Sequence, residues 1–532
     1  MNKSLAFLFC ALFIMVIALL TGACADNDDD DSADQNPSED DTADDDSNDD
    51  DISDDDASDD DAGDDDSGDD DSGDDDSGDD DSGDDDSGDD DSGDDDSSPG
   101  DYWEPSTVVP IGVYPEIRGL MVERGIIHIH SVYSHDACDN NPMPGGQPNE
   151  KCLAELREAM CTTNQQYIML TDHASIFADN EFPDVLLYRP DEGDELVYDD
   201  DDPIANIISC PDGNKTILMA GSENDLMPLH LHRAPGDTPE ERHAVLGAKD
   251  EAAVELLKTF GAQLIVNHSE LWTTEELAAL SIDGIELYNL HANLGTETWP
   301  IVETVLKVLP YLFPRDEAGH CDLLLMSFFE ENATDLAHFD KLLALRRQVG
   351  VLATDVHRNS IPFPLWDGDR GDSYRRLMRW FANYILVENH EVPDIEEALA
   401  KGRMYGAFQL FGEPVGFDFY AQTAKSVAEM GDEIALDDDP VLHVEIPTFY
   451  NMDPTLPAPE FSARIIQAGA DGGTVVAESD GDPIDYQVTE SGAYRVEVHV
   501  VPNHLLKWLG GHPDRYIHEY PLIYANPIYV TE

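Results

Sequence analysis

Five apolar, β-rich runs alternate with helix-like segments through residues 125–357, and each run ends in polar side chains. Helical patterns occupy residues 149–161, 250–260 and 334–348 between them. Strands that alternate with helices predict an α/β fold, either a barrel or a doubly wound sheet, in which functional side chains gather at the carboxyl ends of the strands. The residues that end these runs are therefore the first candidates for a site.

The run ends supply imidazole and carboxylate side chains. His128 and His130 are expected on one face of a strand, because side chains alternate along it, so both imidazoles could bind one ion. An isolated His-x-His is more often structural, whereas five ordered clusters indicate a shared metal site. Mixed imidazole and carboxylate ligands suit zinc, manganese or iron. The later clusters contain Asp172 and His173, Glu223, His268, and Asp355 and His357.

The order of these clusters resembles the polymerase and histidinol phosphatase (PHP) family of metal-dependent phosphoesterases. The matching motifs are His128, His130, Ser134 and Asp136, then Thr171-Asp172-His173, Glu223, His268, residues 284–289 and Asp355-x-His357. The resemblance spans residues 126–419 and implies a distorted (β/α)7-type PHP barrel. Ala137 and Ser269 replace a glycine and a proline that are usual in the family, which changes the pocket and removes no ligand.

Carried over residue by residue, the resemblance implies three divalent metal ions. The first would be held by His128, His130, Glu223 and Asp355, the second by Glu223, His268 and a further histidine, and the third by Asp136, His173 and His357. The spacing from Glu223 favours His230 as the further histidine, as in the extracytoplasmic branch that includes carbaryl hydrolases, with His232 as the alternative. Asp172 and Glu286 are expected to orient imidazoles, and Arg358 to meet an anionic group of the substrate.

The activity that the resemblance implies is hydrolysis of a phosphomonoester or phosphodiester, in the EC 3.1 class. A hydroxide held between metal ions would attack phosphorus, with Glu223, His268 and Asp355 as the central catalytic residues. One alternative keeps the metals and cleaves a carbamate, ester or amide bond. The other is a metal-binding lipoprotein without turnover.

The first 24 residues have the features of a secretory signal. Lys3 precedes an apolar run over residues 5–20, and small residues lead to Cys24. This pattern resembles a bacterial lipoprotein signal, in which Cys24 would carry the lipid; an ordinary cleaved signal or an uncleaved anchor is the alternative. We therefore expect a membrane-anchored, extracytoplasmic protein, in the periplasm or at the cell surface.

The region after the signal, residues 25–105, is predicted to be a disordered linker. Residues 26–100 contain 42 acidic residues and neither lysine nor arginine, so they cannot bury apolar surface. The whole chain carries a net charge of −88, which argues against binding to nucleic-acid backbones and leaves a small molecule, possibly phosphorylated, as the expected partner.

The remaining chain is expected to form two domains, a PHP metallohydrolase domain over residues 106–418 and a small β-sandwich over residues 419–532. Short alternating runs divided by Gly, Asp and Pro suggest the sandwich. Five cysteines follow the signal, and two disulfides are expected outside the cytoplasm. Pairing of Cys138 with Cys152 or Cys161 would close the loop over residues 140–148, but the sequence does not choose among the pairings.

Overall fold

A computed structural model of the protein describes residues 102–290, 319–511 and 513–532. The expected signal, Cys24 as the expected site of lipidation and nearly all of the acidic linker lie outside the described residues, so those expectations stay predictions. Within the described ranges, no helix is both long enough and apolar enough to cross a membrane.

Parallel strands form the first limb of the main sheet. Strand β1 (Met121–Ile129) pairs with β2 (Tyr167–His173), and β2 pairs with β5 (Lys215–Glu223) in a register that sets His173 opposite Glu223. Antiparallel strands β4 (Asp202–Ser209) and β3 (Glu195–Asp199) extend this edge. The helix α3 (Glu150–Thr162) begins where the Asn149 side chain accepts a hydrogen bond from the backbone N–H of Cys152.

The second limb also starts at β1, on its other edge. Here β9 (Val349–Val356) pairs in parallel with β1 and with β8 (Gly284–Asn289), and β8 pairs in parallel with β7 (Gln263–Val266). The short β6 (Met227–Leu229) is antiparallel to β7. The helices of this limb are α5 (Pro239–Leu246), α6 (Glu251–Lys258), α7 (Thr274–Ala279) and α10 (Ala333–Leu343).

The described strands do not close into the expected barrel. No ladder joins β5 to β6 in the part of the chain that the structure describes. The gap arises because the chain reverses direction soon after Glu223. The next strand, β6, is therefore antiparallel to β7 and does not continue the parallel order of β5. The α/β class with parallel central strands is shown, and the closed (β/α)7 geometry is not.

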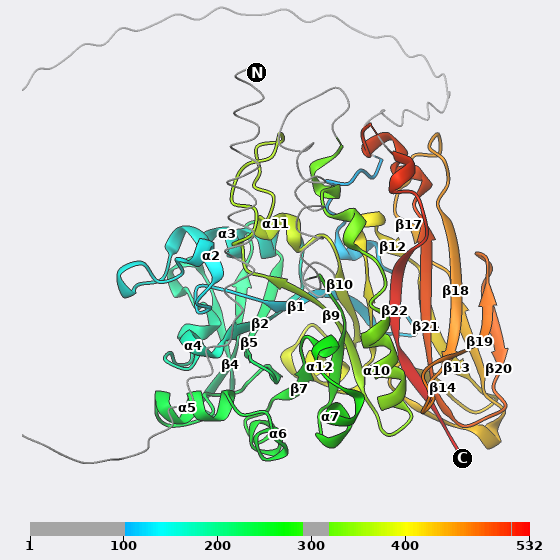
Figure 1. The fold of residues 1–532 in the computed structure, drawn as a ribbon, viewed down its shortest axis with the longest axis horizontal. Helices are drawn as coiled ribbons and strands as arrows, with labels where there is room; N and C mark the ends of the chain where they lie inside the picture. Colours follow the sequence, from blue (N-terminus) through cyan, green and yellow to red (C-terminus); the bar gives the residue numbers. More distant parts are fainter. Residues whose placement is uncertain (1–101, 291–318, 512) are drawn as a thin grey trace, which may run out of the picture. The chain divides into compact units, whose positions relative to one another are not determined.

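The C-terminal strands continue the same sheet (Figure 1). β10 (Ala382–Val387) is antiparallel to β1, followed in spatial order by β11 (Met404–Ala407), β22 (Tyr520–Thr531), β21 (Gly492–Val501), β18 (Glu460–Gln467) and β19 (Thr474–Ser479). A second sheet contains β14 (Val427–Glu429), β13 (Asp418–Gln422), β16 (Val441–Glu445) and β20 (Ile484–Gln487). The shorter elements are α2 (Ala137–Asn140), α4 (Ala174–Phe177), α11 (Tyr374–Leu377), α12 (Val392–Lys401), β12 (Pro414–Val415), β15 (Glu433–Ala435) and β17 (Thr448–Phe449).

The two C-terminal sheets share one apolar core with the first limb, which includes Ala421, Val444, Ile465 and Val496. Because β22 returns to pair with β11, the strands after residue 419 are joined to the α/β part through backbone hydrogen bonds. The expected sandwich is therefore built partly on an extension of the main sheet.

Two disulfides connect segments of the first limb. Cys138 bonds to Cys152, which closes the loop over residues 140–148, and Cys161 bonds to Cys210 at the end of β4. Cys321 remains a buried thiol. Of the two partners that the sequence left open for Cys138, the structure shows Cys152.

Candidate metal centre

The candidate ligands are brought together by the carboxyl ends of the strands. β1 shifts register between Ile127 and Ile129, and His128 at this bulge has a left-handed backbone with φ of 64°. His268 after β7 and Asp355 near the end of β9 are also left-handed, with φ of 46° and 50°. Residues other than glycine rarely adopt this backbone conformation, and such strain concentrates at functional sites.

Four buried ligand atoms define the first group. Nε2 of His128 lies 3.2 Å from Glu223 Oε2 and 3.4 Å from Asp355 Oδ1, and Nε2 of His130 lies 3.1 Å and 3.4 Å from the same oxygens. All four ligand atoms lie within 4.8 Å of one another. This is the set expected for the first ion.

The tautomers of these imidazoles are set by their outer neighbours. His128 Nδ1–H donates to Glu286 Oε1 at 2.6 Å, since a carboxylate can only accept. The Ser134 hydroxyl donates to Asp136 Oδ1 at 3.1 Å, so its oxygen is left to accept from Nδ1 of His130 at 3.1 Å. With the proton on Nδ1, each Nε2 presents a lone pair.

Lone pairs therefore face carboxylate oxygens, which is an arrangement that requires a cation. Nε2 of His128, Nε2 of His130 and Oε2 of Glu223 are buried and make no hydrogen bond to the described residues. Acceptors at 3.1–3.4 Å repel unless a proton or a metal ion lies between them. The donor set thus fits a divalent ion with nitrogen and oxygen ligands.

The residues expected for the third ion lie beside the first group. His357 Nε2 is 3.1 Å from Asp136 Oδ2 and 3.3 Å from Nε2 of His173, which is itself 3.6 Å from the same Asp136 oxygen. His357 Nδ1–H donates to the Asp355 carbonyl at 3.1 Å, so its Nε2 also presents a lone pair. His173 Nδ1 approaches Glu223 Oε2 at 3.4 Å, which links the two groups.

His268 approaches both shared acids from the far side. Its Nε2 lies 3.4 Å from Glu223 Oε1 and 3.4 Å from Asp355 Oδ2. Asn267 donates to Glu223 Oε1 at 2.6 Å. Sequence reasoning assigned Asn267 no role, although its position directly before His268 at a strand end was the available signal.

His230 does not join this centre, contrary to the expected ligand set for the second ion. Leu229 pairs with Gln263 at the start of β7, whereas His268 follows the end of β7. Continuing this register sets His230 opposite Ala262, and since a strand rises about 3.3 Å per residue, the two histidines are separated by roughly 20 Å along the sheet. The structure instead groups His230 with His232 and Glu396.

Glu286 and Asp172 support the ligands in different ways. Glu286 Oε2 accepts from the backbone N–H of His268 at 2.9 Å and from Asn289 at 3.1 Å, while its other oxygen holds His128. Among the described residues, Asp172 hydrogen-bonds no imidazole directly; it accepts from the backbone N–H and hydroxyl of Ser131 at 2.5 and 2.6 Å. Glu286 therefore orients an imidazole directly, and Asp172 fixes the backbone that follows His130.

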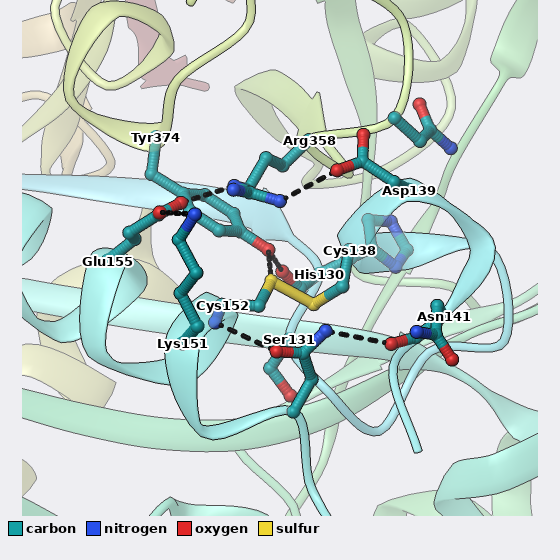
Figure 2. Close-up of a disulfide and its surroundings, with 12 residues drawn as sticks. His130, Ser131, Cys138, Asp139, Asn141, Lys151, Cys152, Glu155, Arg358 and Tyr374 are labelled. Atoms are coloured by element: carbon teal, nitrogen blue, oxygen red, sulfur yellow. Dashed lines mark hydrogen bonds and ion pairs between the residues drawn. A yellow bond between two sulfur atoms is a disulfide. The ribbon is translucent and has the colours of Figure 1, made fainter. Parts of the chain in front are cut away.

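Arg358 is occupied by neighbouring acids. It forms ion pairs with Asp139 at 3.0 Å and with Glu155 at 2.5 Å, close to the Cys138–Cys152 disulfide (Figure 2). The side chain is largely buried between these partners. This geometry does not support the expected contact between Arg358 and an anionic substrate.

The buried acids and imidazoles of the centre shift one another's pKa values. Burial raises the pKa of Glu223, but the neighbouring imidazoles of His128, His130 and His268 outweigh it, so the net pKa is well below normal. Burial lowers the pKa of His173, yet Asp136 and Glu223 raise it to about 9. Burial and the charge of His130 lower the pKa of His357 to about 3. Glu223 therefore stays ionised, whereas His357 stays neutral and keeps the lone pair on Nε2.

A second polar pair lies behind His268. The Ser269 hydroxyl lies 2.5 Å from Asp335 Oδ1 and 3.0 Å from the Glu286 carbonyl, and one hydroxyl proton cannot serve both. A protonated Asp335 resolves this by donating to Ser269 Oγ while Ser269 donates to the carbonyl. Burial raises the pKa of Asp335 to about 8, in agreement with a neutral carboxylic acid.

Comparisons with known proteins add little to this geometry. No protein-family model matches the chain, and no curated protein matches it. One solved structure, a two-domain protein containing a predicted PHP-like metal-dependent phosphoesterase from Bacteroides vulgatus, matches at 13% identity over 78% of this chain and 97% of that chain. The TM-score of that match is 0.28, so the likeness carries no argument about the activity of this protein.

Proposed function

We propose that this protein is a metal-dependent hydrolase and that its substrate is a small phosphoester. The observation that carries the proposal is the Glu223 carboxylate, whose oxygens lie 3.1–3.4 Å from ring nitrogens of His128, His130, His173 and His268. One carboxylate shared by four imidazoles is the arrangement expected where ligand sets for neighbouring ions meet.

Bound divalent ions would supply Lewis acidity and a water of lowered pKa. The protein's own residues prepare for them. Glu286, Ser134 and the Asp355 carbonyl keep Nδ1 of His128, His130 and His357 protonated, so each Nε2 presents a lone pair within the centre. Burial of Glu223 and Asp355 excludes water from their oxygens and strengthens their attraction for cations.

A carbamate, ester or amide hydrolase is the second candidate, and the state of Arg358 favours it. Because Arg358 is paired with Asp139 and Glu155, two carboxylates already neutralise its charge, which weakens its attraction for a phosphate. A phosphorylated substrate would then depend on the metal ions for charge neutralisation. A carbonyl substrate has no such requirement.

We further propose that the protein acts outside the cytoplasm and is held at a membrane by a lipid on Cys24. Support comes from the two disulfides, which are typical of oxidising compartments, and from the signal-like pattern before Cys24. Lipid labelling of the expressed chain, lost in a Cys24→Ala variant, would test the anchor.

The activity is tested by assaying purified protein loaded with Mn²⁺ or Zn²⁺ on bis-p-nitrophenyl phosphate, p-nitrophenyl phosphate and naphthyl carbamates. We expect turnover of a phosphate ester that is lost in Glu223→Ala and kept in the control His443→Ala. This control removes a histidine on β16 that is paired with Asp485 on β20. Turnover of carbamates alone would select the second candidate. No turnover by metal-replete protein on any substrate would contradict hydrolysis and favour a binding protein.

A further inference from the structure

A second group of metal-binding side chains lies away from the catalytic centre. His230 follows β6, His232 is held by a hydrogen bond from its backbone N–H to the Phe260 carbonyl at 2.9 Å, and Glu396 lies on α12. Their ligand atoms all lie within 4.8 Å of one another. Three segments that are distant in sequence therefore converge at this point.

The imidazole of His230 is the unexplained member of the group. The residue is only 6% exposed, and both of its ring nitrogens lack a hydrogen-bond partner among the described residues. Its Nδ1 lies 3.4 Å from Glu396 Oε1, without the geometry of a hydrogen bond. Leaving such a group buried and unsatisfied is unfavourable, so a ligand that uses its lone pair would stabilise the folded protein.

Glu396 is positioned between the two imidazoles. The oxygen Oε1 that faces His230 also lies 2.8 Å from His232 Nε2. The ring centroids of the two histidines are 6.3 Å apart, and the rings are inclined at 46° to each other. One ion could therefore be approached by both rings and by the carboxylate.

Asp199 approaches His232 from the opposite ring nitrogen. Its Oδ2, at the end of β3, lies 3.5 Å from Nδ1 of His232, and its side chain is largely exposed. Nε2 of His232, which faces Glu396, is therefore the nitrogen available to the ion. Two nitrogens and one carboxylate give three protein ligands, and a water would complete a four-coordinate set of the kind that zinc adopts.

We propose that His230, His232 and Glu396 bind a single zinc-class ion, with water as the fourth ligand. The bound ion would fasten α12 to the segment that follows β6. The site is independent of the catalytic proposal, because none of its residues contacts Glu223 within the described chain.

The two kinds of site are separated by counting metal in a background where the catalytic centre cannot bind. The full chain with Glu223→Ala, Asp355→Ala and Asp136→Ala, which removes a ligand from each ion of the catalytic centre, is stripped of metal and titrated with Co²⁺. The titration is followed by visible absorption, and metal content is measured after dialysis. We expect one retained equivalent with the intense visible bands of four-coordinate cobalt. No retained equivalent in folded protein would overturn the proposal.

Single substitutions in the otherwise unchanged chain then assign the ligands. His232→Ala and the isosteric Glu396→Gln should each hold one metal equivalent fewer than the unsubstituted protein. The matched control His243→Ala removes an exposed histidine paired with Asp179 at 3.0 Å and should lose none. Unchanged metal content in both His232→Ala and Glu396→Gln would refute the site. The cobalt titration, which leaves these ligands intact, decides the question if a single variant fails to fold.

Discussion

Glu286→Gln tests whether the metal centre depends on the tautomer of His128. Oε2 of Glu286 receives hydrogen bonds from the His268 backbone N–H and from Asn289, so a glutamine must keep its oxygen at that position. Its NH2 group then faces Nδ1 of His128 in place of an acceptor. Nδ1 would become the acceptor, and the ring proton would move to Nε2, the atom that faces Glu223 and Asp355.

The expected loss arises because a proton on Nε2 blocks metal coordination. Outer hydrogen-bond partners of metal-bound histidines contribute about 10–100-fold in affinity, or about 1.4–2.7 kcal/mol. Glutamine and glutamate are equal in size, so the buried position is kept without a cavity. We expect metal affinity, measured by competition with a chromogenic chelator at neutral pH, to fall by about 10–100-fold, and activity to recover when metal is added in excess.

A matched control separates this effect from general destabilisation. Glu413 is also buried and forms an ion pair with Arg124 at 2.9 Å, and it belongs to none of the described groups of metal-binding side chains. Glu413→Gln should lower the melting temperature and leave metal affinity unchanged. If Glu286→Gln binds metal within twofold of the unsubstituted protein, the tautomer argument is wrong.

Three further outcomes are expected. Because the pKa of Asp335 rises from 3.8 to about 8 on folding, the folded state holds a proton that the unfolded state has lost, so this group's stabilisation, up to a few kcal/mol, should decline as pH rises from about 4 to about 8. Chemical denaturation across that range should show the decline, and Asp335→Asn should flatten it; an unchanged profile would contradict a protonated Asp335. Since His173 has its pKa raised to about 9, protons compete with metal below that pH, and affinity measured by calorimetry should strengthen as pH rises from 6 to 9; a flat dependence would count against His173 as a ligand. Replacing Cys138 and Cys152 by serine removes a disulfide of sequence separation 14 and should lower the free energy of unfolding by about 3 kcal/mol in chemical denaturation. Equal stability of the variant and the unsubstituted protein would contradict the presence of this disulfide.

The strand ends could be predicted because their signal is local. An apolar run followed by His, Asp or Glu identified the ends of β2, β5 and β9, and the helical pattern over residues 149–161 closely matches α3. The helix expected over residues 334–348 ends earlier, at Leu343, because the chain must turn before β9 begins at Val349. Alternation alone does not show where such a turn falls.

The errors concern direction and partners, which local patterns do not encode. His230 was expected beside Glu223 from its spacing, but the antiparallel course of β6 carries it toward the other end of β7. Arg358 was expected to face substrate, but Asp139 and Glu155 reach it from other segments. The pairing of β22 with β11, which joins the C-terminal strands to the main sheet, likewise links residues too far apart for periodicity to pair.

The central claim is that Glu223 is shared between metal ions held by strand-end histidines. Anomalous X-ray scattering from crystals of manganese- or zinc-loaded protein tests it most directly. We predict anomalous peaks on both sides of the Glu223 carboxylate, with one of them about 2.0–2.2 Å from Nε2 of His128 and His130. Crystals that are saturated with metal but show no peak beside Glu223 would contradict the account.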